Sequence, residues 1–268
     1  MRIQDKVFVV TGGGNGMGRE VVLLLLRKGA RVAAVDISQP ALTETMDLAG
    51  DMKDRLSTHV VNITDKAAVE ALPDAVIKIH GAVDGLINNA GIIQKFVRIK
   101  DLPYADIEKV MNVNFYGLLY MTKTFLPYLL ARPEAHILNI SSMGGFLPVP
   151  GQTAYGASKA AVKLFTEGLN SELLDSNVRV TIVFPGAIAT NIAANSGVTA
   201  EPGDASKGPK IKMTSATVAA ELIVNAIEKN LYRVNIGSDS KLMDFLYRLM
   251  PERAARIIYS QMRSLLPA

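Results

Sequence analysis

Tyr155 and Lys159 are four residues apart in the segment QTAYGASKAAVKLF. On a helix this spacing puts both side chains on one face, so the Lys159 ammonium can lie beside the Tyr155 phenol. A neighbouring cation favours the phenolate and lowers the pKa of a tyrosine, which suits it to general acid–base work. Tyr155 is the only one of the eight tyrosines with lysine at this offset, and Ser142 precedes it by 13 residues. Together the three residues predict proton transfer at a substrate oxygen.

A glycine-rich segment near the N-terminus, TGGGNGMG, follows a short apolar run. Gly12, Gly16 and Gly18 stand at a TGxxxGxG spacing, with Asn15 and Met17 between them. Glycines let a backbone turn sharply and approach a pyrophosphate, and the helix that follows offers N–H donors and the positive end of its dipole. In this strand–turn–helix context the segment predicts a dinucleotide-binding site.

The second apolar run, RVAAVD, ends in Asp36, 18 residues after Gly18. A carboxylate at about this offset accepts hydrogen bonds from the adenosine ribose of NAD and repels the 2′-phosphate of NADP. Asn15 and Ile37, where a cation would favour that phosphate, are uncharged. NAD is therefore the predicted cofactor, and NADP is less favoured. The alternative interpretation of Asp36 is a solvated side chain that opens a loop.

Short β-branched segments alternate with longer segments of helical periodicity along the chain. This alternation predicts an α/β fold, a Rossmann-like doubly wound sheet of about seven parallel strands with helices on both faces. The expected strands are residues 6–11, 31–36, 57–63, 84–88, 136–141, 179–184 and 232–237. The expected helices lie near residues 17–28, 40–50, 66–80, 104–131, 153–175 and 215–230. Residues 1–268 are expected to form one dinucleotide-binding and catalytic domain.

The composition argues against several classes of function. The chain contains no cysteine, which excludes disulfides and thiolate chemistry and favours a cytoplasmic location. The net charge is +4, but the lysines and arginines are scattered among acids, so nucleic-acid binding is not expected. Neither a secretion signal nor a membrane-spanning stretch is expected. His59, His80 and His136 lack metal-ligand spacing, so we expect structural roles for them and no metal site.

Two segments near the C-terminal end lie outside the alternating pattern. Residues 195–213 are rich in Gly, Pro and Lys and have no period, and we expect a substrate lid at 191–213. The tail at 240–268 is basic and amphipathic, and Pro251 predicts that it forms two short helices rather than one. We expect the tail to pack over the substrate cleft or against a neighbouring subunit. Contact with anionic lipid is a less favoured alternative.

Taken in order, the motifs of residues 3–237 resemble the short-chain dehydrogenase/reductase family in its compact, single-domain form. The motifs are TGGGNGMG at 11–18, NNAG at 88–91, NVN at 112–114, Ser142, YGASK at 155–159 and PGAIAT at 185–190. The resemblance implies that Ser142 orients a carbonyl oxygen, Tyr155 exchanges its proton, Lys159 also binds the nicotinamide ribose, and Asn114 holds a water that relays protons to Lys159.

The resemblance also implies a set of cofactor contacts. Asn89, Ala90 and Gly91 would line the adenosine side, and Pro185, Ile188 and Thr190 would hold the nicotinamide. The acid that contacts adenine in the family is here Asn62, which keeps an acceptor and loses the charge. The full expected cofactor set is Gly12, Asn15, Gly16, Met17, Gly18, Asp36, Ile37, Asn62, Ile63, Asn89, Ala90, Gly91, Tyr155, Lys159, Pro185, Gly186, Ile188 and Thr190.

The substrate is less well defined by sequence than the cofactor. The residues expected to face it by their place beside the motifs are Gln94, Phe96, Met143, Val149, Gln152, Gly186 and Ile192. This mostly apolar set favours hydride transfer between NAD(H) and a lipophilic secondary alcohol or ketone, steroid-like or acyl-derived. The alternatives are a 3-oxoacyl thioester reductase and a non-catalytic NAD-binding regulator, and the intact Asn114, Ser142, Tyr155 and Lys159 argue against the regulator. Through helices 104–131 and 153–175 the resemblance implies a homodimer or homotetramer.

Overall fold

The computed structural model describes residues 1–196 and 213–266. The first half contains β1 (Val7–Thr11), α1 (Gly16–Arg27), β2 (Arg31–Asp36), α2 (Gln39–Leu48), β3 (Leu56–Val60), α3 (Lys66–His80), β4 (Gly85–Asn88), α4 (Tyr104–Met111) and α5 (Leu118–Leu130). The second half contains β5 (Ala135–Ile140), α6 (Thr153–Glu172), β6 (Val178–Pro185), β7 (Ile188–Ala189), α7 (Ile192–Asn195), β8 (Thr214–Ser215), α8 (Ala216–Glu228), β9 (Arg233–Ile236), α9 (Ser238–Leu249) and α10 (Pro251–Met262).

Seven strands form one parallel sheet in the order β3-β2-β1-β4-β5-β6-β9. The chain runs outward from β1 to β3 and then returns to place β4 on the other side of β1. In open α/β sheets, ligands bind at the carboxyl ends of the strands where the order reverses in this way. The predicted doubly wound fold is confirmed, and the sequence places the glycine-rich segment at the switch point, directly after β1.

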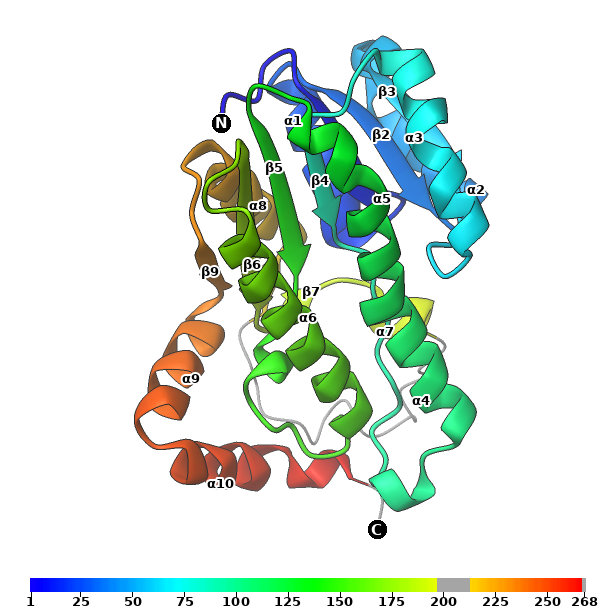
Figure 1. Cartoon of the computed structure of the whole chain (residues 1–268). Coiled ribbons are helices and arrows are strands. Elements are labelled where there is room, and N and C mark those ends of the chain that lie inside the picture. The colour runs from blue at the N-terminus through cyan, green and yellow to red at the C-terminus, as the bar shows by residue number, and fades with distance from the viewer. Residues whose placement is uncertain (197–212, 267–268) are drawn as a thin grey trace.

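Hydrophobic cores lie on both faces of the sheet. On one face, Phe8 and Leu138 pack with side chains of α1 and α8. On the other, Val9 and Ile137 pack with α3, α5 and α6, and α5 and α6 lie in front of the sheet in Figure 1. Burial on both faces explains why the central strands are nearly continuous apolar runs rather than alternating ones.

The structure corrects two of the expected elements. The strand expected at 57–63 ends at Val60, so Asn62 and Ile63 lie in the turn after it. The single helix expected at 104–131 is α4, a π-helical turn at Asn112–Gly117, and α5. Periodicity alone does not reveal a π turn, because such a turn adds one residue without ending the helix.

The tail forms two helices, α9 and α10, with Pro251 at the start of the second, as predicted. They lie beyond the carboxyl ends of the strands, at the bottom of Figure 1. Met243 and Ile258 pack there against Leu147, so the tail covers the segment that follows Ser142. Among the described residues no helix is long and apolar enough to cross a membrane. Of the expected lid, residues 197–212 lie outside the described residues.

Candidate active site

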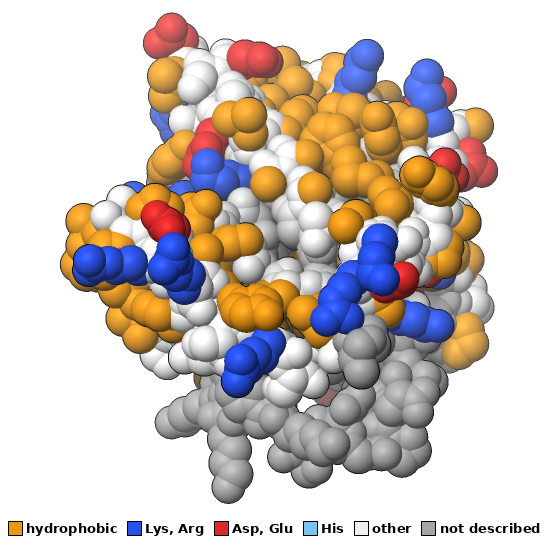
Figure 2. Space-filling view, turned by 90° about the horizontal axis from the view of Figure 1, so that it is seen from below, with side chains coloured by type: hydrophobic (Ala, Val, Ile, Leu, Met, Phe, Trp, Pro, Cys, Tyr) orange, Lys and Arg blue, Asp and Glu red, His pale blue; other side chains and the backbone are white. Residues whose placement is uncertain are grey.

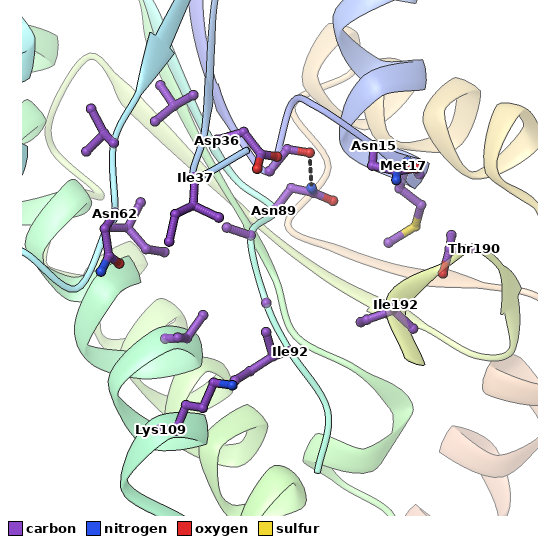
Figure 3. A pocket seen from close by; sticks show the side chains of 18 residues that line it. Asn15, Met17, Asp36, Ile37, Asn62, Asn89, Ile92, Lys109, Thr190 and Ile192 are labelled. Atoms are coloured by element: carbon purple, nitrogen blue, oxygen red, sulfur yellow. Dashed lines mark hydrogen bonds between the residues drawn. The ribbon is translucent and has the colours of Figure 1, made fainter. Parts of the chain in front are cut away.

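A cavity of about 370 Å³ opens where the carboxyl ends of β1, β2 and β4 meet (Figure 3). Its volume falls in the roughly 300–1,000 Å³ range of small-molecule sites. The predicted cofactor residues that line it are Gly12, Asn15, Gly16, Met17, Asp36, Ile37, Asn62, Ile63, Asn89, Ala90, Gly91 and Thr190. Ile192, expected at the substrate, lines this cavity too. The lining residues that sequence reasoning missed are Val35, Val61, Ile92, Lys109 and Val113.

The glycine-rich turn closes one end of the cavity. Gly12 and Gly16 adopt positive φ angles of 67° and 53°, which disfavour other residues. A Cβ at Gly18 would lie 2.0 Å from the Gly12 carbonyl oxygen, so the first turn of α1 can approach β1 only with glycine there. Asn15 caps α1, and its Oδ1 accepts a hydrogen bond from the Gly16 N–H at 2.7 Å. The turn thus brings backbone and the helix N-terminus to the cavity wall.

Asp36 is held at the edge of the cavity by two backbone donors. Its Oδ2 accepts from the Gly14 N–H and its Oδ1 from the Ser38 N–H, both at 3.0 Å. The guanidinium of Arg19 holds the same glycine from the other side, because it donates to the Gly14 carbonyl oxygen, and it also donates to Glu44 at 2.6 Å. The carboxylate therefore keeps one orientation beside the glycine-rich turn.

Asn89 lies on the floor of the cavity. Its Nδ2 donates to the carbonyl oxygens of Thr11 and Gly12, and the Thr11 hydroxyl accepts from the N–H groups of Asn89 and Ala90. Its Oδ1 is buried without a partner in the structure. A dinucleotide fits these residues, because the cavity offers close backbone approach, a fixed carboxylate and an unused acceptor. Asn88 instead points into the core, where it donates to Thr122 and Asn139.

Tyr155 and Lys159 both lie on α6, where their four-residue spacing puts them on one face. Neither is among the residues that line the 370 Å³ cavity. Lys159 is only 4% exposed, its Nζ donates to the Ile140 carbonyl oxygen at 3.1 Å, and burial lowers its pKa to about 8. The lowered pKa expected for Tyr155 is not found. Burial raises the pKa of the Tyr155 phenol, and a hydrogen bond with Ser142 only partly opposes this. Desolvation of the phenolate outweighs the stabilisation that the sequence suggested.

Ser142 follows β5 and caps the 3₁₀ turn Met143–Gly145, where its Oγ accepts from the Gly144 N–H at 3.1 Å. A Cβ at Gly144 would lie 3.3 Å from a ring carbon of Tyr155 and 3.6 Å from the Ser142 Oγ, so glycine lets this turn approach the phenol. The neighbouring Ser141 donates to the Lys159 carbonyl oxygen at 2.8 Å and ties β5 to α6.

Asn114 lies within the π-helical turn and is 1% exposed. Its Oδ1 accepts from the Ile92 N–H at 2.9 Å, while its Nδ2 donates to the Ile92 carbonyl oxygen and to the Ser158 hydroxyl. A Cβ placed on Gly91 would lie 3.2 Å from both the Asn114 Oδ1 and the Lys159 Nζ. Asn114, Lys159 and the NNAG segment therefore meet at Gly91.

The residues expected at the substrate have different surroundings. Gln94 and Gln152 are buried, and their side-chain amides donate to backbone carbonyl oxygens. Gln94 donates to Gly151, and Gln152 donates to Gln94. Met143 and Val149 are partly buried against the core of the tail. Phe96 and Leu266 both approach Gly151, where an added Cβ would lie 2.9 Å from Leu266 and 3.4 Å from Phe96. The described part of the tail thus reaches the segment that leads into α6.

The PGAIAT segment links β6 to the cavity. Pro185 ends β6, and Gly186 donates its N–H to the Ile236 carbonyl oxygen at 2.9 Å. Ile188 belongs to β7, which pairs with β8, and Thr190 reaches the cavity wall. Pro185, Gly186 and Ile188 themselves do not line the 370 Å³ cavity.

None of the three histidines lines the 370 Å³ cavity. The Ser57 hydroxyl hydrogen-bonds both His59 and His80 at 2.8 Å. His136 bonds Thr181, and burial lowers its pKa to about 3. Within the described residues no cluster of potential ligands could hold a metal ion.

The family model described as short chain dehydrogenase matches residues 6–200. The chain belongs to the short-chain dehydrogenase/reductase family. It is 36% identical over 271 residues to the SadH protein of Mycobacterium tuberculosis, covering 98% of each chain. It is also 36% identical over 192 residues to the 3-oxoacyl-acyl-carrier-protein reductase FabG of Thermotoga maritima, covering 71% of this chain and 77% of the relative.

Solved structures of the short-chain dehydrogenase/reductase family share the fold. An enzyme from Burkholderia phymatum in complex with NAD is 25% identical with a TM-score of 0.81, over 93% of this chain and 96% of that one. A dehydrogenase from Burkholderia cenocepacia J2315 in complex with NADP is 26% identical with a TM-score of 0.79, over the whole of both chains. Membership makes this chain an oxidoreductase of a family that binds NAD(P).

Proposed function

We propose that this chain transfers a hydride between NAD(H) and a lipophilic secondary alcohol or ketone. The observation that carries the proposal is two pairs of contacts: the Tyr155 phenol hydrogen-bonds Ser142, and Asn114 and Lys159 meet at Gly91, which lines the cavity. A non-catalytic nucleotide-binding regulator would have no need for a phenol paired with a hydroxyl or for a buried ammonium.

Family membership implies a role for each side chain. The bound nicotinamide would supply or accept the hydride. Tyr155 would give its proton to the substrate oxygen in reduction and take it back in oxidation, while Ser142, which hydrogen-bonds the phenol, would orient that oxygen. The buried Lys159 ammonium would lie near the phenol and the ribose. Asn114, fixed by Ile92 and Ser158, would hold the water that returns protons to Lys159.

The preference for NAD over NADP rests on Asp36. Its carboxylate is fixed at the cavity edge by Gly14 and Ser38, where it can accept from ribose hydroxyls. The neighbouring Ile37 is 68% exposed and offers no positive charge to a 2′-phosphate. Family structures bind either cofactor, so this local chemistry supplies the argument for NAD.

The proposed substrate class follows from apolar side chains beyond Ser142. Met143 and Val149 lie against the core formed with α9 and α10, and the Leu266 side chain reaches Gly151. These residues favour an apolar group attached to the reacting carbonyl. A 3-oxoacyl thioester reductase is the second candidate, favoured by the 36% identity to the Thermotoga FabG.

We also propose that the chain acts in the cytoplasm as a homodimer or homotetramer. The outer faces of α6 and the π-helical turn expose Leu164 at 70% and Tyr116 at 42%. Exposed apolar side chains on long helices are suited to subunit contacts. On the tail, Leu242, Phe245 and Leu249 are also more than half exposed, and Figure 2, seen from that end, shows hydrophobic and basic side chains intermixed.

The Tyr155→Phe substitution tests the chemistry, after a screen of ketones, secondary alcohols, steroids and acyl thioesters for change in NADH absorbance. The variant keeps the ring and loses one hydroxyl, so folding and NADH binding should persist. The turnover rate should fall by roughly 10²–10⁴-fold. A folded variant saturated with NADH that stays within about threefold of wild type would contradict Tyr155 as the acid.

A further inference from the structure

Asp239, the second residue of α9, contacts the segment that links β6 to the cavity. Its Oδ2 accepts a hydrogen bond from the Ala187 N–H at 2.7 Å, across 52 positions of the chain. Nothing in the sequence marks this contact, because Asp239 belongs to no motif and sits where an acid commonly complements a helix N-terminus. Its carboxylate bonds a backbone group outside its own helix.

The Asp239 carboxylate packs so closely against two glycines that neither leaves room for a Cβ. A Cβ at Gly186 would lie 2.2 Å from the Asp239 Oδ2 and 2.4 Å from its Cγ. A Cβ at Gly237 would lie 2.3 Å from the Oδ1, and Gly237 has a φ of 95°, which disfavours any other residue. Both contacts are shorter than real Cβ atoms tolerate. The chain therefore packs the Asp239 carboxylate directly onto backbone on both sides.

We propose that Asp239 is a positioning residue for the nicotinamide-binding loop 185–190. This inference rests on the proposed function, because the role of that loop is part of it. Ala187 lies between Pro185, at the end of β6, and Thr190, which lines the cavity. A hydrogen bond to a charged acceptor is stronger than a neutral one, so it fixes the Ala187 peptide firmly.

Two further hydrogen bonds fix the backbone on either side of Pro185. The Ser240 hydroxyl donates to the Phe184 carbonyl oxygen at 2.8 Å, and the Gly186 N–H donates to Ile236 at 2.9 Å. The chain at Phe184 and Gly186 is thus tied both to the end of β9 and to the start of α9. Further along α9, Met243 packs against Leu147, so the same helix contacts both the proposed cofactor loop and the segment after Ser142.

Binding measured by calorimetry with two nucleotides tests the role of Asp239. ADP-ribose carries the adenosine, pyrophosphate and second ribose of NADH but no nicotinamide. Asp239→Ala leaves the Ala187 N–H without its acceptor, and we expect the Kd for NADH to rise about tenfold or more, because a hydrogen bond to a charged acceptor is lost. The Kd for ADP-ribose should stay within about twofold of wild type. Asp239→Asn, which keeps an oxygen acceptor, should restore most of the NADH affinity.

A matched control lies on the same helix. Asp244 bonds Arg233 at 2.7 Å and Arg248 at 3.1 Å, so Asp244→Asn should lower thermal stability and leave both Kd values within about twofold of wild type.

A double-mutant cycle keeps the proposal falsifiable if Asp239→Ala folds poorly. Gly186→Ala should weaken NADH binding strongly in wild type and beside the isosteric Asp239→Asn, where the added Cβ meets the side chain at 239, and much less beside Asp239→Ala. The proposal is overturned if Gly186→Ala is harmless in wild type, if its effect is the same in every background, or if Asp239→Ala weakens both nucleotides equally. A wild-type protein that binds ADP-ribose but not NADH would instead refute the proposed function.

Discussion

The backbone N–H of Tyr155 donates a hydrogen bond to the side-chain Oε1 of Gln94, 2.9 Å away and 61 positions earlier in the chain. Tyr155 is the third residue of α6, where N–H groups have no partner within the helix. The preceding Gln152 makes no side-chain cap, so Gln94 supplies it from the loop after β4. The loop and the proposed acid are therefore mutually positioned.

Loss of this cap should reduce both stability and turnover. Gln94→Ala should lower the free energy of unfolding by about 1–2 kcal/mol, the size of a lost cap in a buried setting. Urea titration measures the first effect and steady-state kinetics the second. Gln39→Ala removes an exposed glutamine from α2 and serves as the control. Equal stability of the Gln94 and Gln39 variants would show that the Tyr155 N–H finds another acceptor.

Lys159 should make stability rise with pH in the alkaline range. Burial lowers its pKa to about 8 from 10.5, so between these values the unfolded chain binds more protons than the folded one. The free energy of unfolding must then increase with pH, by up to about 3 kcal/mol across the interval. Lys159→Met removes this dependence. The free energy of unfolding of the variant, relative to that of wild type, should therefore be higher at pH 7 than at pH 9.5. Urea titrations without nucleotide at both values test this.

Lys66→Met, at an exposed lysine of α3, is the matched control for loss of one cation. If wild type and Lys159→Met differ by the same amount at both pH values, the buried ammonium has no such cost.

Asp36 should set the cofactor preference. Wild type should have the higher kcat/KM with NADH, and Asp36→Ala should shift the NADH-to-NADPH ratio by about tenfold or more, because two charges near 4 Å interact by roughly 1–4 kcal/mol. The variant also loses the acceptor for Gly14 and Ser38, so KM for NADH should rise as well. Initial rates with both cofactors provide the measurement. More efficient turnover of NADPH by wild type would refute this role.

Assembly should depend on the outer face of α6. Light scattering should give a mass that is a multiple of the 28.8 kDa chain. Leu164→Glu places a charge on the exposed face of α6 and should shift the mass downward, whereas Leu174→Glu, at a similarly exposed site just after α6, should not. A wild-type mass of a single chain at micromolar concentration would contradict the proposed oligomer.

Much of the fold was predictable because its signals are local. The helix expected at residues 66–80 matches α3, which Asp65 caps and Gly81 ends. Residues of the glycine-rich turn and Asp36 line one cavity, as adjacent parallel strands lead one to expect, since each follows its own strand directly. Local propensity and strand order together determine these positions.

Contacts between distant segments were not predictable in the same way. Nothing in the sequence indicates that Gln94 caps α6 at Tyr155, 61 positions away. Lys109, on α4, was missed at the cavity because it belongs to no motif. The pKa of Tyr155 moved opposite to expectation because burial, which spacing does not report, dominates. In each case the deciding interaction involves tertiary packing.

The π-helical turn at Asn112–Gly117 also constrains how this chain can change in length. Such a turn holds one extra residue, so a single deletion between Met111 and Leu118 would allow α4 and α5 to join as one regular helix. That deletion would rotate α4 by about 100° relative to α5 and turn Lys109 away from the cavity. We therefore expect natural insertions and deletions to occur in surface loops and to avoid this turn, because a change in its length would alter the direction in which α4 presents its side chains to the cavity.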